Sequence, residues 1–370
     1  MNDEGTTRRV PFDYWLLLCT LLLVGLGVVM VYSASAVLAG ERYGDPAYFL
    51  KRESCFVLLG LAGMTAAARC PYPVWRRVVY GLLALSALLL GCAYIPGIRS
   101  TVGGASRWIH LGPVRFQPSE LAKLTIVIFL AYSLEKKAAR MKSFAVGLFP
   151  HMVIGGIMIV LILGQRDFGS AFLVASILFC MLLVGGSRLT YLGAMVIAAL
   201  PLLYFAVASV DYRRKRILAF LNPWSDRYGS GFQIIQSLIA FKEGGLLGRG
   251  LGEGQQKLFY LPEAHTDFIA SVIGEELGLI GMLCLLALYG FFCLRGFMTA
   301  WRAPDSFGRY LAFGITVLLS WQAVCNLGVV MGLLPTKGMV LPFVSYGGSS
   351  LLVSLVAVGI MLNISSYRKV

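Results

Sequence analysis

Hydrophobic residues in this chain form long, continuous runs that short polar segments separate. Ten runs approach the roughly 20 apolar residues that a helix needs to cross a bilayer. They lie at 14–36, 54–69, 78–95, 119–135, 145–164, 169–186, 189–209, 268–294, 310–331 and 347–364. Strands of a membrane β-barrel would alternate apolar and polar residues instead. The pattern predicts an all-α, polytopic membrane protein with ten transmembrane helices in a single membrane domain, 1–370.

The composition supports a membrane protein. The chain is 58% hydrophobic and 14% charged, whereas soluble domains carry about 25% charged residues. Its net charge of +14 does not predict nucleic acid as a partner, because the basic residues flank the apolar runs. The eight cysteines lie in or beside those runs, which indicates small buried residues rather than a disulfide framework. The first run is too long for a signal-peptide core and is predicted to be retained.

The distribution of basic residues predicts the orientation. Ten spans place both termini on one side, where the short segments carry 15 Lys and Arg residues against nine in the short loops opposite. Because Lys and Arg in short loops favour the cytoplasm, both termini are predicted to be cytoplasmic. The one long polar segment, 210–267, is then a large extracytoplasmic loop between helices 7 and 8.

Two parts of this long loop have recognisable patterns. The apolar stretch 232–241 is too short to cross a bilayer, which favours an interfacial or re-entrant helix. The glycine-rich stretch 244–257 could cradle phosphate through its backbone amides. It matches neither the P-loop nor the dinucleotide pattern, so chain flexibility is an equally good interpretation.

Several polar residues lie at the outer ends of the predicted spans. Glu120 and Lys123 are three residues apart and share a helix face, which predicts an intrahelical ion pair. Asp167 lies either in a turn at the membrane surface or in a polar gate that lines a cavity. The last outer loop has two prolines and repeated glycine and serine, with Lys337 as its only charge and Ser349 as a candidate helix cap.

Carboxylates gather around the start of the eighth run. Asp267 directly precedes it, close to Glu263 and His265 in the sequence, and Glu275 and Glu276 lie inside it. A carboxylate inside a membrane is costly unless it is paired, and Lys123 is the predicted partner of Glu275 or Glu276. Asp267 fits two roles, a helix cap or a general base. A helix N-terminus lowers the pKa of such a carboxyl and burial raises it, so the residues alone leave both roles open.

The outer face therefore combines carboxylates with basic side chains beneath a lipid surface. Such a face suits an amphiphile with a polyanionic head, for example a lipid-linked pyrophosphate. Polymerising such a substrate requires a base for the acceptor hydroxyl and cations for the departing pyrophosphate. Asp267 is the candidate base, and Arg107, Lys123 and Lys337 are among the candidate cations.

Specific motifs give the chain a resemblance to a known family. They are Gly104-Ala-Ser-Arg-Trp108, Gln117-Pro-Ser-Glu-Leu-Ala-Lys123, Gln165-x-Asp167-x-Gly169, Gln255-Gln-Lys through Asp267, Gly274-Glu-Glu-Leu-Gly278, Pro335-Thr-Lys-Gly338 and Pro342-Phe-Val-Ser-Tyr-Gly-Gly-Ser-Ser350. With them the chain resembles the SEDS family (shape, elongation, division and sporulation proteins) over nearly all its spans. The sequence around Asp267 and Lys337 resembles that of the division branch of the family, and the sporulation branch is similar at both places. Ala270 departs from the aromatic residue that is commoner at its position.

The resemblance implies a ten-helix SEDS fold and a peptidoglycan glycosyltransferase that polymerises lipid II at the outer face of the cytoplasmic (inner) membrane during cell division. It implies Asp267 as the catalytic residue. The predicted substrate-binding residues are Arg107, Lys123, Lys257, Glu263, His265, Lys337, Ser345 and Ser349. Glu120, Asp167, Glu275 and Glu276 are predicted to be structural intramembrane charges.

The resemblance also implies partners and a cofactor. The implied protein partners are a class B penicillin-binding protein, which supplies the transpeptidase, and other divisome membrane proteins. The family is helped by a divalent cation such as Mg²⁺ or Mn²⁺, but the sequence shows no defined ligand set. The alternative function is a lipid II flippase, which would use Glu275, Lys123 and Asp167 to carry the head group. A flippase needs charges on both sides of the midplane, and the cytoplasmic halves of the spans are largely uncharged, which favours the polymerase.

Overall fold

The computed structural model describes residues 7–97, 99–102, 105–111, 114–208, 211–229, 231–258 and 260–369, so Gly104 of the first motif lies outside them. The helices are α1 (Tyr14–Tyr43), α2 (Tyr48–Arg69), α3 (Val74–Cys92), α4 (Pro118–Lys136), α5 (Phe149–Gly164), α6 (Phe168–Val184), α7 (Leu189–Ala208), α8 (Asp211–Leu221), α9 (Phe232–Gly244), α10 (Ile269–Arg302), α11 (Ser306–Val330) and α12 (Gly348–Ser365). Short helical turns are η1 (Ala138–Arg140), the π-helix η2 (Phe144–Leu148) and η3 (Pro223–Asp226).

Two small antiparallel sheets accompany the helices, and the sequence pattern did not predict them. One consists of β2 (Arg99–Val102), β3 (Ala105–Leu111) and β4 (Val114–Phe116) in the order β2-β3-β4. In the other, β1 (Thr7–Arg9) pairs with β5 (Tyr367–Lys369), with Thr7 opposite Lys369. The protein is therefore predominantly, but not entirely, α-helical.

Each of the ten predicted spans overlaps a helix. Among the described residues, six helices are long and apolar enough to cross a membrane, namely α1, α3, η2 with α5 (Phe144–Gly164), α10, α11 and α12. The apolar helices α6 and α7 are shorter, and α2 and α4 carry charged residues in their first two turns. The structure thus supports a polytopic membrane protein, and the number of ten crossings stays a prediction.

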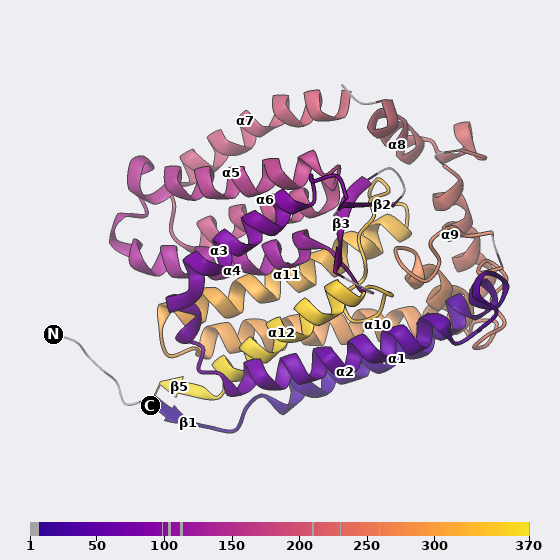
Figure 1. Cartoon of the computed structure of the whole chain (residues 1–370), viewed down its shortest axis with the longest axis horizontal. Coiled ribbons are helices and arrows are strands. Elements are labelled where there is room, and N and C mark those ends of the chain that lie inside the picture. The colour runs from indigo at the N-terminus through magenta and orange to yellow at the C-terminus, as the bar shows by residue number, and fades with distance from the viewer. Residues whose placement is uncertain are drawn as a thin grey trace.

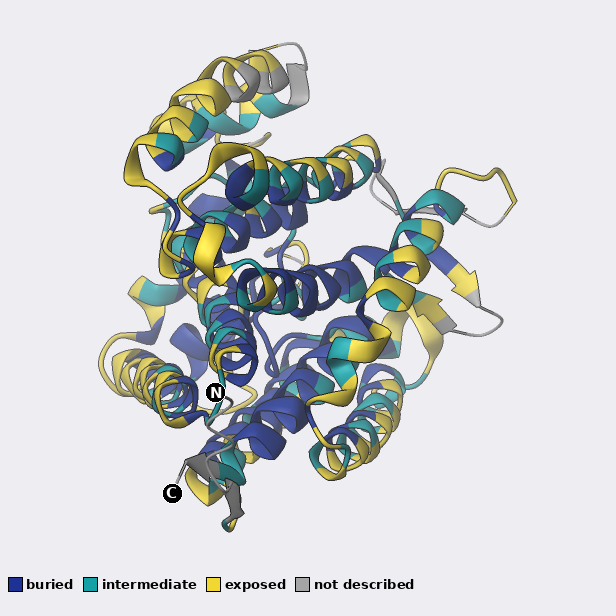
Figure 2. Cartoon of the chain, turned by 90° about the vertical axis from the view of Figure 1, so that its left-hand side faces the viewer, coloured by how far each residue is buried: buried dark blue, intermediate teal, exposed yellow. Residues whose placement is uncertain are grey.

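The core of the bundle consists of α4, α11 and α12. Most residues of these three helices are buried, and Figure 2 shows buried helices in the middle of the bundle. Helices α1, α2 and α10 pack on one side of this core, and α3, α5 and α6 pack on the other. Helix α7 lies at the periphery and exposes large apolar side chains such as Ile197 and Phe205. Exposed apolar surface of this kind suits contact with lipid.

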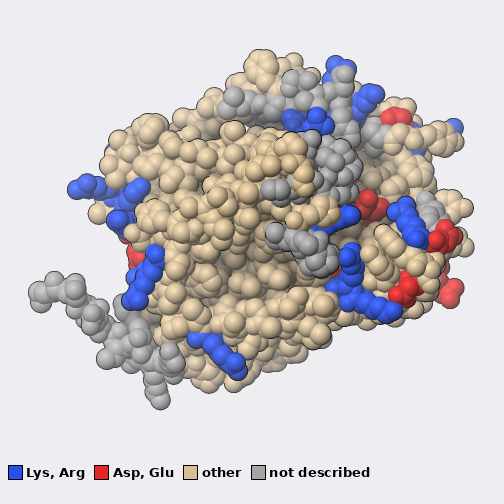
Figure 3. Space-filling view, viewed as in Figure 1, with Lys and Arg blue, Asp and Glu red and all other residues tan. Residues whose placement is uncertain are grey.

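The two ends of the bundle differ. Strands β1 and β5 lie at one end, which we call the termini end, and the β2–β4 sheet and α9 lie towards the other, the sheet end (Figure 1). Lys, Arg, Asp and Glu side chains gather at the two ends, with a broad uncharged band between them (Figure 3). This distribution is typical of a membrane protein, in which charged side chains avoid the hydrocarbon.

Local sequence signals explain several helix ends. Asp13 caps α1 by accepting hydrogen bonds from the amides of Trp15 and Leu16, each 3.1 Å long. Gly44 ends α1 with a φ of 69°, a left-handed conformation that favours glycine. Close packing of helices also depends on glycine, because a side chain at Gly359 of α12 would overlap the backbone of α2 at Met64.

Helix α10 is interrupted at Gly278, which has φ 65° and ψ −163°. Residues 269–277 therefore form a short helix of their own, followed by the long remainder of α10. The sequence predicted one continuous span at 268–294. The interruption was missed because Gly278 falls within an apolar run, where hydropathy does not register a change of backbone conformation.

Candidate active site

Asp267 lies in a compact turn at the sheet end, directly before the short helix 269–277. Within this turn the amides of Thr266 and Phe268 donate to the carbonyl of Glu263, at 3.1 and 3.2 Å. The N-cap position of α10 is occupied by Phe268, without a side-chain capping bond. The backbone carbonyl of Asp267 accepts a 2.8 Å hydrogen bond from Asn326 Nδ2. The helix-cap role for Asp267 is therefore not what the structure shows.

The carboxylate of Asp267 faces the guanidinium of Arg107 across Gly338. A Cβ atom on Gly338 would lie 3.2 Å from Oδ2 of Asp267 and 3.2 Å from both terminal nitrogens of Arg107. Arg107 belongs to β3, and its Nε atom is buried with no hydrogen-bond partner among the described residues. A buried donor without a partner is rare in folded proteins, and a bound anion would satisfy it.

Burial decides the protonation behaviour of Asp267. It raises the pKa of the carboxyl from 3.8 to about 7, against the opposing effect of Arg107. Glu263 raises this pKa further, Arg216 lowers it, and Asp167 raises it slightly. A group with a pKa near neutrality is suited to general base catalysis.

Lys337 lies beside Gly338, with its side chain directed to the start of α6. Its Nζ is 3.9 Å from the ring centroid of Phe172 and 5.7 Å from that of Phe168. An ammonium over an aromatic ring is held by a cation–π interaction. Burial lowers the pKa of Lys337. The preceding residue of this loop, Thr336, accepts a 2.9 Å hydrogen bond at its carbonyl from Arg216 of α8.

His265 and Glu263 flank the turn that carries Asp267. The His265 ring packs against Phe49 and Tyr346, with centroids 4.7 and 5.7 Å away, and burial lowers the pKa of its imidazole. Glu263 is exposed and accepts a 2.8 Å hydrogen bond from Thr266. Both residues lie next to the candidate base, His265 packed among aromatic rings and Glu263 in contact with solvent.

The prediction that Lys123 pairs with Glu275 or Glu276 is wrong. Lys123 is buried and binds Glu120 at 2.8 Å and Gln322 Oε1 at 2.9 Å. The predicted intrahelical ion pair between Glu120 and Lys123 is confirmed. The pair lines a cavity of about 10 Å³ between α4, α11 and α12, room for about one water molecule.

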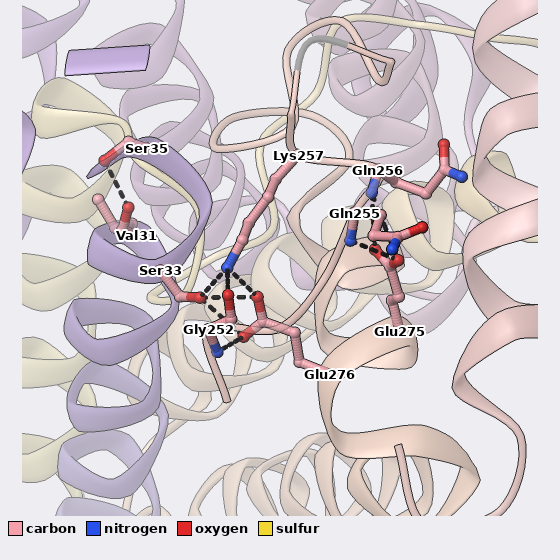
Figure 4. A network of polar contacts seen from close by, with 9 residues as sticks. All are labelled: Val31, Ser33, Ser35, Gly252, Gln255, Gln256, Lys257, Glu275 and Glu276. Atoms are coloured by element: carbon pink, nitrogen blue, oxygen red, sulfur yellow. Dashed lines mark hydrogen bonds and ion pairs between the residues drawn. The ribbon is translucent and has the colours of Figure 1, made fainter. Parts of the chain in front are cut away.

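The two intramembrane glutamates are instead bound by the glycine-rich loop (Figure 4). Glu275 accepts from the amides of Gln255 and Gln256, at 2.7 and 3.2 Å. Glu276 forms a buried ion pair of 2.7 Å with Lys257 and accepts from the amide of Gly252 at 3.1 Å. The backbone amides suggested for phosphate thus bind carboxylates of the same chain.

Asp167 caps α6 and links it to α4. Its carboxylate accepts from the Ser170 amide at 3.1 Å, from Gln117 Nε2 at 2.9 Å and from the Ser119 hydroxyl at 3.0 Å. Of its two interpretations, the structure supports a capped turn rather than an open gate.

The two serines predicted to bind substrate make bonds within the protein. Ser349 accepts from the Gln117 amide at 3.1 Å and donates to the Arg115 carbonyl at 3.3 Å. Ser345 accepts from the Leu341 amide at 2.8 Å. The structure gives both hydroxyls a role in holding the last outer loop in shape.

Two residues near the site were missed at the sequence level. Asn326 bridges the carbonyls of Asp267 and Met339, at 2.8 and 2.6 Å, and Gln322 joins Lys123 to the carbonyl of Val340 at 3.1 Å. Both are amides four residues apart on an apolar helix, and polar residues at that depth usually face the protein interior. That spacing was the available signal.

The cysteines and possible metal ligands give simple results. All eight cysteines are free thiols, but only Cys19 and Cys325 are buried, and Cys55 and Cys284 are exposed. The expectation of small buried residues therefore holds for two of the eight. The described residues contain no group of three or more His, Cys, Asp or Glu side chains that could hold a metal ion. A requirement for Mg²⁺ or Mn²⁺ stays a prediction.

Comparisons with known proteins give consistent results. A family profile described as "Cell cycle protein" (FTSW_RODA_SPOVE) matches residues 14–370. The chain is 52% identical to the probable peptidoglycan glycosyltransferase FtsW of Geobacter metallireducens, over 97% of this chain and 96% of the relative. It is 41% identical to the stage V sporulation protein E of Bacillus subtilis, over 98% and 100% of the two chains.

Solved structures share the fold. A chain from a peptidoglycan synthase complex, studied for its structural coordination of polymerization and crosslinking, superposes with a TM-score of 0.79 at 32% identity, over 96% of this chain and 97% of that one. The rod shape determining protein RodA of Thermus thermophilus gives a TM-score of 0.70 at 30% identity, over 96% of each chain.

Proposed function

The chain belongs to the FtsW, RodA and SpoVE family of cell cycle proteins, and from that membership we propose that it is a peptidoglycan glycosyltransferase that polymerises lipid II for septal cell-wall synthesis. The observation that carries this proposal is the pairing of Asp267, whose pKa is raised to about 7, with the partly unsatisfied guanidinium of Arg107 across Gly338. One group accepts a proton and the other neutralises an anion, as glycosyl transfer from a pyrophosphate requires.

In the proposed reaction Asp267 takes the proton from the acceptor sugar hydroxyl. The oxygen attacks the anomeric carbon of the donor from the face opposite the leaving group, so the new C–O bond has inverted configuration. The bond between that carbon and the pyrophosphate oxygen breaks, and undecaprenyl pyrophosphate departs with the electron pair. Arg107 and Lys337 stabilise the negative charge that develops on it.

The proposed setting is the cytoplasmic membrane, with ten crossings, both termini in the cytoplasm and the 210–267 segment outside. The position of β1 and β5 at one end, opposite the β2–β4 sheet whose strand β3 carries Arg107, supports this arrangement. The similar chain from a peptidoglycan synthase complex supports a class B penicillin-binding protein as partner. Other divisome membrane proteins are expected to bind as well.

The internal pairing of the buried charges favours polymerisation over flipping. A flippase would need Glu275, Lys123 and Asp167 free to contact a passing head group. Each is instead hydrogen-bonded within the protein. Breaking such buried bonds without replacement is costly.

A polymerisation assay tests the proposal. The protein, purified with its partner, is expected to make glycan strands from labelled lipid II, and Asp267→Ala is expected to abolish them while the protein stays folded. Glu243→Gln, which removes an exposed carboxylate paired with Arg249, is the matched control and should polymerise normally. Polymer formation by Asp267→Ala would refute the base assignment. Movement of lipid II across vesicles without polymer would support the flippase.

A further inference from the structure

The interruption of α10 is closed by the glycine-rich loop. The amides of Arg249 and Gly250 donate to the carbonyls of Glu275 and Glu276, both at 3.0 Å. Beyond the interruption, the amide of Leu279 donates to the Gly245 carbonyl at 2.9 Å. A helix end leaves backbone groups without partners, and inside a membrane these must be satisfied by protein. The loop therefore supplies the hydrogen bonds that the interrupted helix lacks.

Glycines are required for this close contact. Gly248 has a φ of 81°, and a side chain there would overlap the backbone of Glu276. Gly278 has a φ of 65°, and a side chain there would overlap the backbone of Gly248. Gly248 and Gly278 thus serve the close approach of the loop to α10, and neither flexibility nor phosphate binding is needed to explain these two glycines.

Side chains reinforce the backbone contacts. We call the set Ser33, Gly252, Gln255, Gln256, Lys257, Glu275 and Glu276 the clasp (Figure 4). Within the clasp, Ser33 of α1 lies 2.7 Å from both carboxylate oxygens of Glu276. Three chain segments, α1, the loop and the short helix 269–277, therefore meet at Glu276.

Lys257 is fully engaged in the clasp. Its ammonium donates to Glu276 Oε1 at 2.7 Å, to the Gly252 carbonyl at 2.7 Å and to Ser33 Oγ at 3.1 Å. A lysine has three N–H donors, so none is left for a substrate phosphate. The side chains of Lys257 and Glu276 are also almost inaccessible, at 5% and 0%. This geometry does not suit the substrate-binding role that the sequence suggested for Lys257.

The clasp closes the segment that carries Asp267. The chain leaves the clasp at Lys257, passes through the turn that holds Asp267, and returns to the clasp at Glu275 and Glu276. Leu261 is tied back to Gln256 by a 2.8 Å backbone bond. Fixing both ends of a loop removes most of its conformational freedom. The position of Asp267 relative to Arg107 thus depends on the clasp.

We propose that Lys257 and Glu276 are positioning residues, which hold the short helix 269–277 so that Asp267 faces Arg107 and Gly338. This role rests on the proposed function of Asp267 as the catalytic base. A displacement of about 1 Å in a catalytic group can reduce a rate about 100-fold, so a break in the clasp acts on turnover rather than on substrate binding.

The test is a double-mutant cycle on the clasp. Lys257→Met and Glu276→Leu each leave one buried charge without its partner, and the double variant leaves none. We expect each single variant to lower kcat about 100-fold with KM for lipid II within about twofold of wild type. Amide hydrogen exchange in 269–277 should rise in both. The double variant should recover most of the turnover and the protection from exchange.

A matched control lies at the other end of the same two helices. Arg295 of α10 binds Asp13, the N-cap of α1, at 2.6 Å. Arg295→Met therefore also removes an ion pair between these two helices, but in the part of α10 that follows the interruption, away from Asp267. It should leave kcat and the exchange of 269–277 unchanged. Ser33→Ala weakens the clasp without leaving a charge unpaired, so it should lower kcat less than the charge variants do. It replaces a charge variant in the test if that variant fails to fold.

Several results would overturn the positioning role. If the double variant stays as inactive as Lys257→Met and both have a raised KM, Lys257 binds substrate directly. If exchange rises while kcat stays at the wild-type value, the short helix does not position the base. Absence of polymer from the wild-type protein would instead refute the proposed function, and the exchange measurements would still show whether the clasp holds 269–277.

Discussion

Replacement of the candidate base by its neutral isostere tests both chemistry and electrostatics. Asp267→Asn keeps the size of the side chain and removes its ability to ionise. Because burial raises the pKa of Asp267 from 3.8 to about 7, the folded protein holds a proton over a pH range in which the unfolded chain releases it. By linkage, wild-type stability falls as pH rises from about 4 to about 7. The asparagine variant lacks this contribution.

The size of the effect follows from the shift. A rise of about three pH units, at about 1.4 kcal/mol for each, corresponds to ~4 kcal/mol. This is an upper bound, because Asp267 is half-buried and solvent screens part of the interaction. The variant also leaves Arg107 without its carboxylate neighbour, which reduces the gain. We therefore expect Asp267→Asn to match wild-type stability near pH 4 and to exceed it above pH 7.

Two measurements check this prediction. Unfolding of wild type and variant in the same detergent, followed from about pH 4 to about pH 8.5, gives the difference in stability as a function of pH. Titrations common to both proteins cancel in that difference. Polymerisation by the wild type should fall about tenfold for each pH unit below about 7 and level off above it. The variant should form no polymer at any pH.

Three results would refute the reasoning. A stability difference that does not change with pH would mean that Asp267 ionises as an exposed carboxyl does. Polymer formation by the asparagine variant would mean that another group accepts the proton. A wild-type rate that is flat from pH 5 to pH 8 would argue against a base with a pKa of about 7.

Three further changes have defined outcomes. Gly338→Ala places a methyl group 3.2 Å from the carboxylate of Asp267 and from the guanidinium of Arg107. It should lower kcat about 10- to 100-fold in lipid II kinetics and leave unfolding unchanged, and a normal kcat would show that the contact adjusts freely. Lys123→Met leaves Glu120 buried without its cation and should destabilise the protein by ~3–5 kcal/mol, measured by unfolding in detergent. Adding Glu120→Gln should largely reverse this destabilisation. Unchanged stability of Lys123→Met would indicate that water reaches the pair. Phe172→Leu removes the aromatic ring 3.9 Å from Lys337, a cation–π contact of about 1–2 kcal/mol, and should lower the polymerisation rate. Phe172→Tyr keeps the ring and should not lower it. An equal loss of rate in both variants would exclude the ring as the cause.

The helical elements were readable from the sequence because hydrophobic runs of this length have few alternatives in lipid. Helix α2 begins at Tyr48, six residues before the predicted span, because hydropathy excludes charged residues such as Lys51 that a helix accepts. The β2–β4 sheet lay in a polar loop, where strands of three to seven residues give no clear alternation.

The candidate site was only partly readable. Asp267, Arg107 and Lys337 were proposed from chemistry and family resemblance, and the structure brings Asp267 and Arg107 together across Gly338. The Glu120–Lys123 pair was predicted from its helical spacing, but the partners of Glu275 and Glu276 were not, because sequence distance says nothing about which loop folds over a helix. The partner of Glu276 lies 19 residues earlier, at Lys257, on the other side of the turn.

The pairing of β1 with β5 has a consequence for engineering the protein. Because Thr7 lies opposite Lys369, a short peptide could join the two ends and close the chain into a ring. The ring could then be cut at an exposed loop to give a circular permutant. In such a molecule, reporters or affinity tags would sit at the new ends, away from the strand pair that they would otherwise disturb.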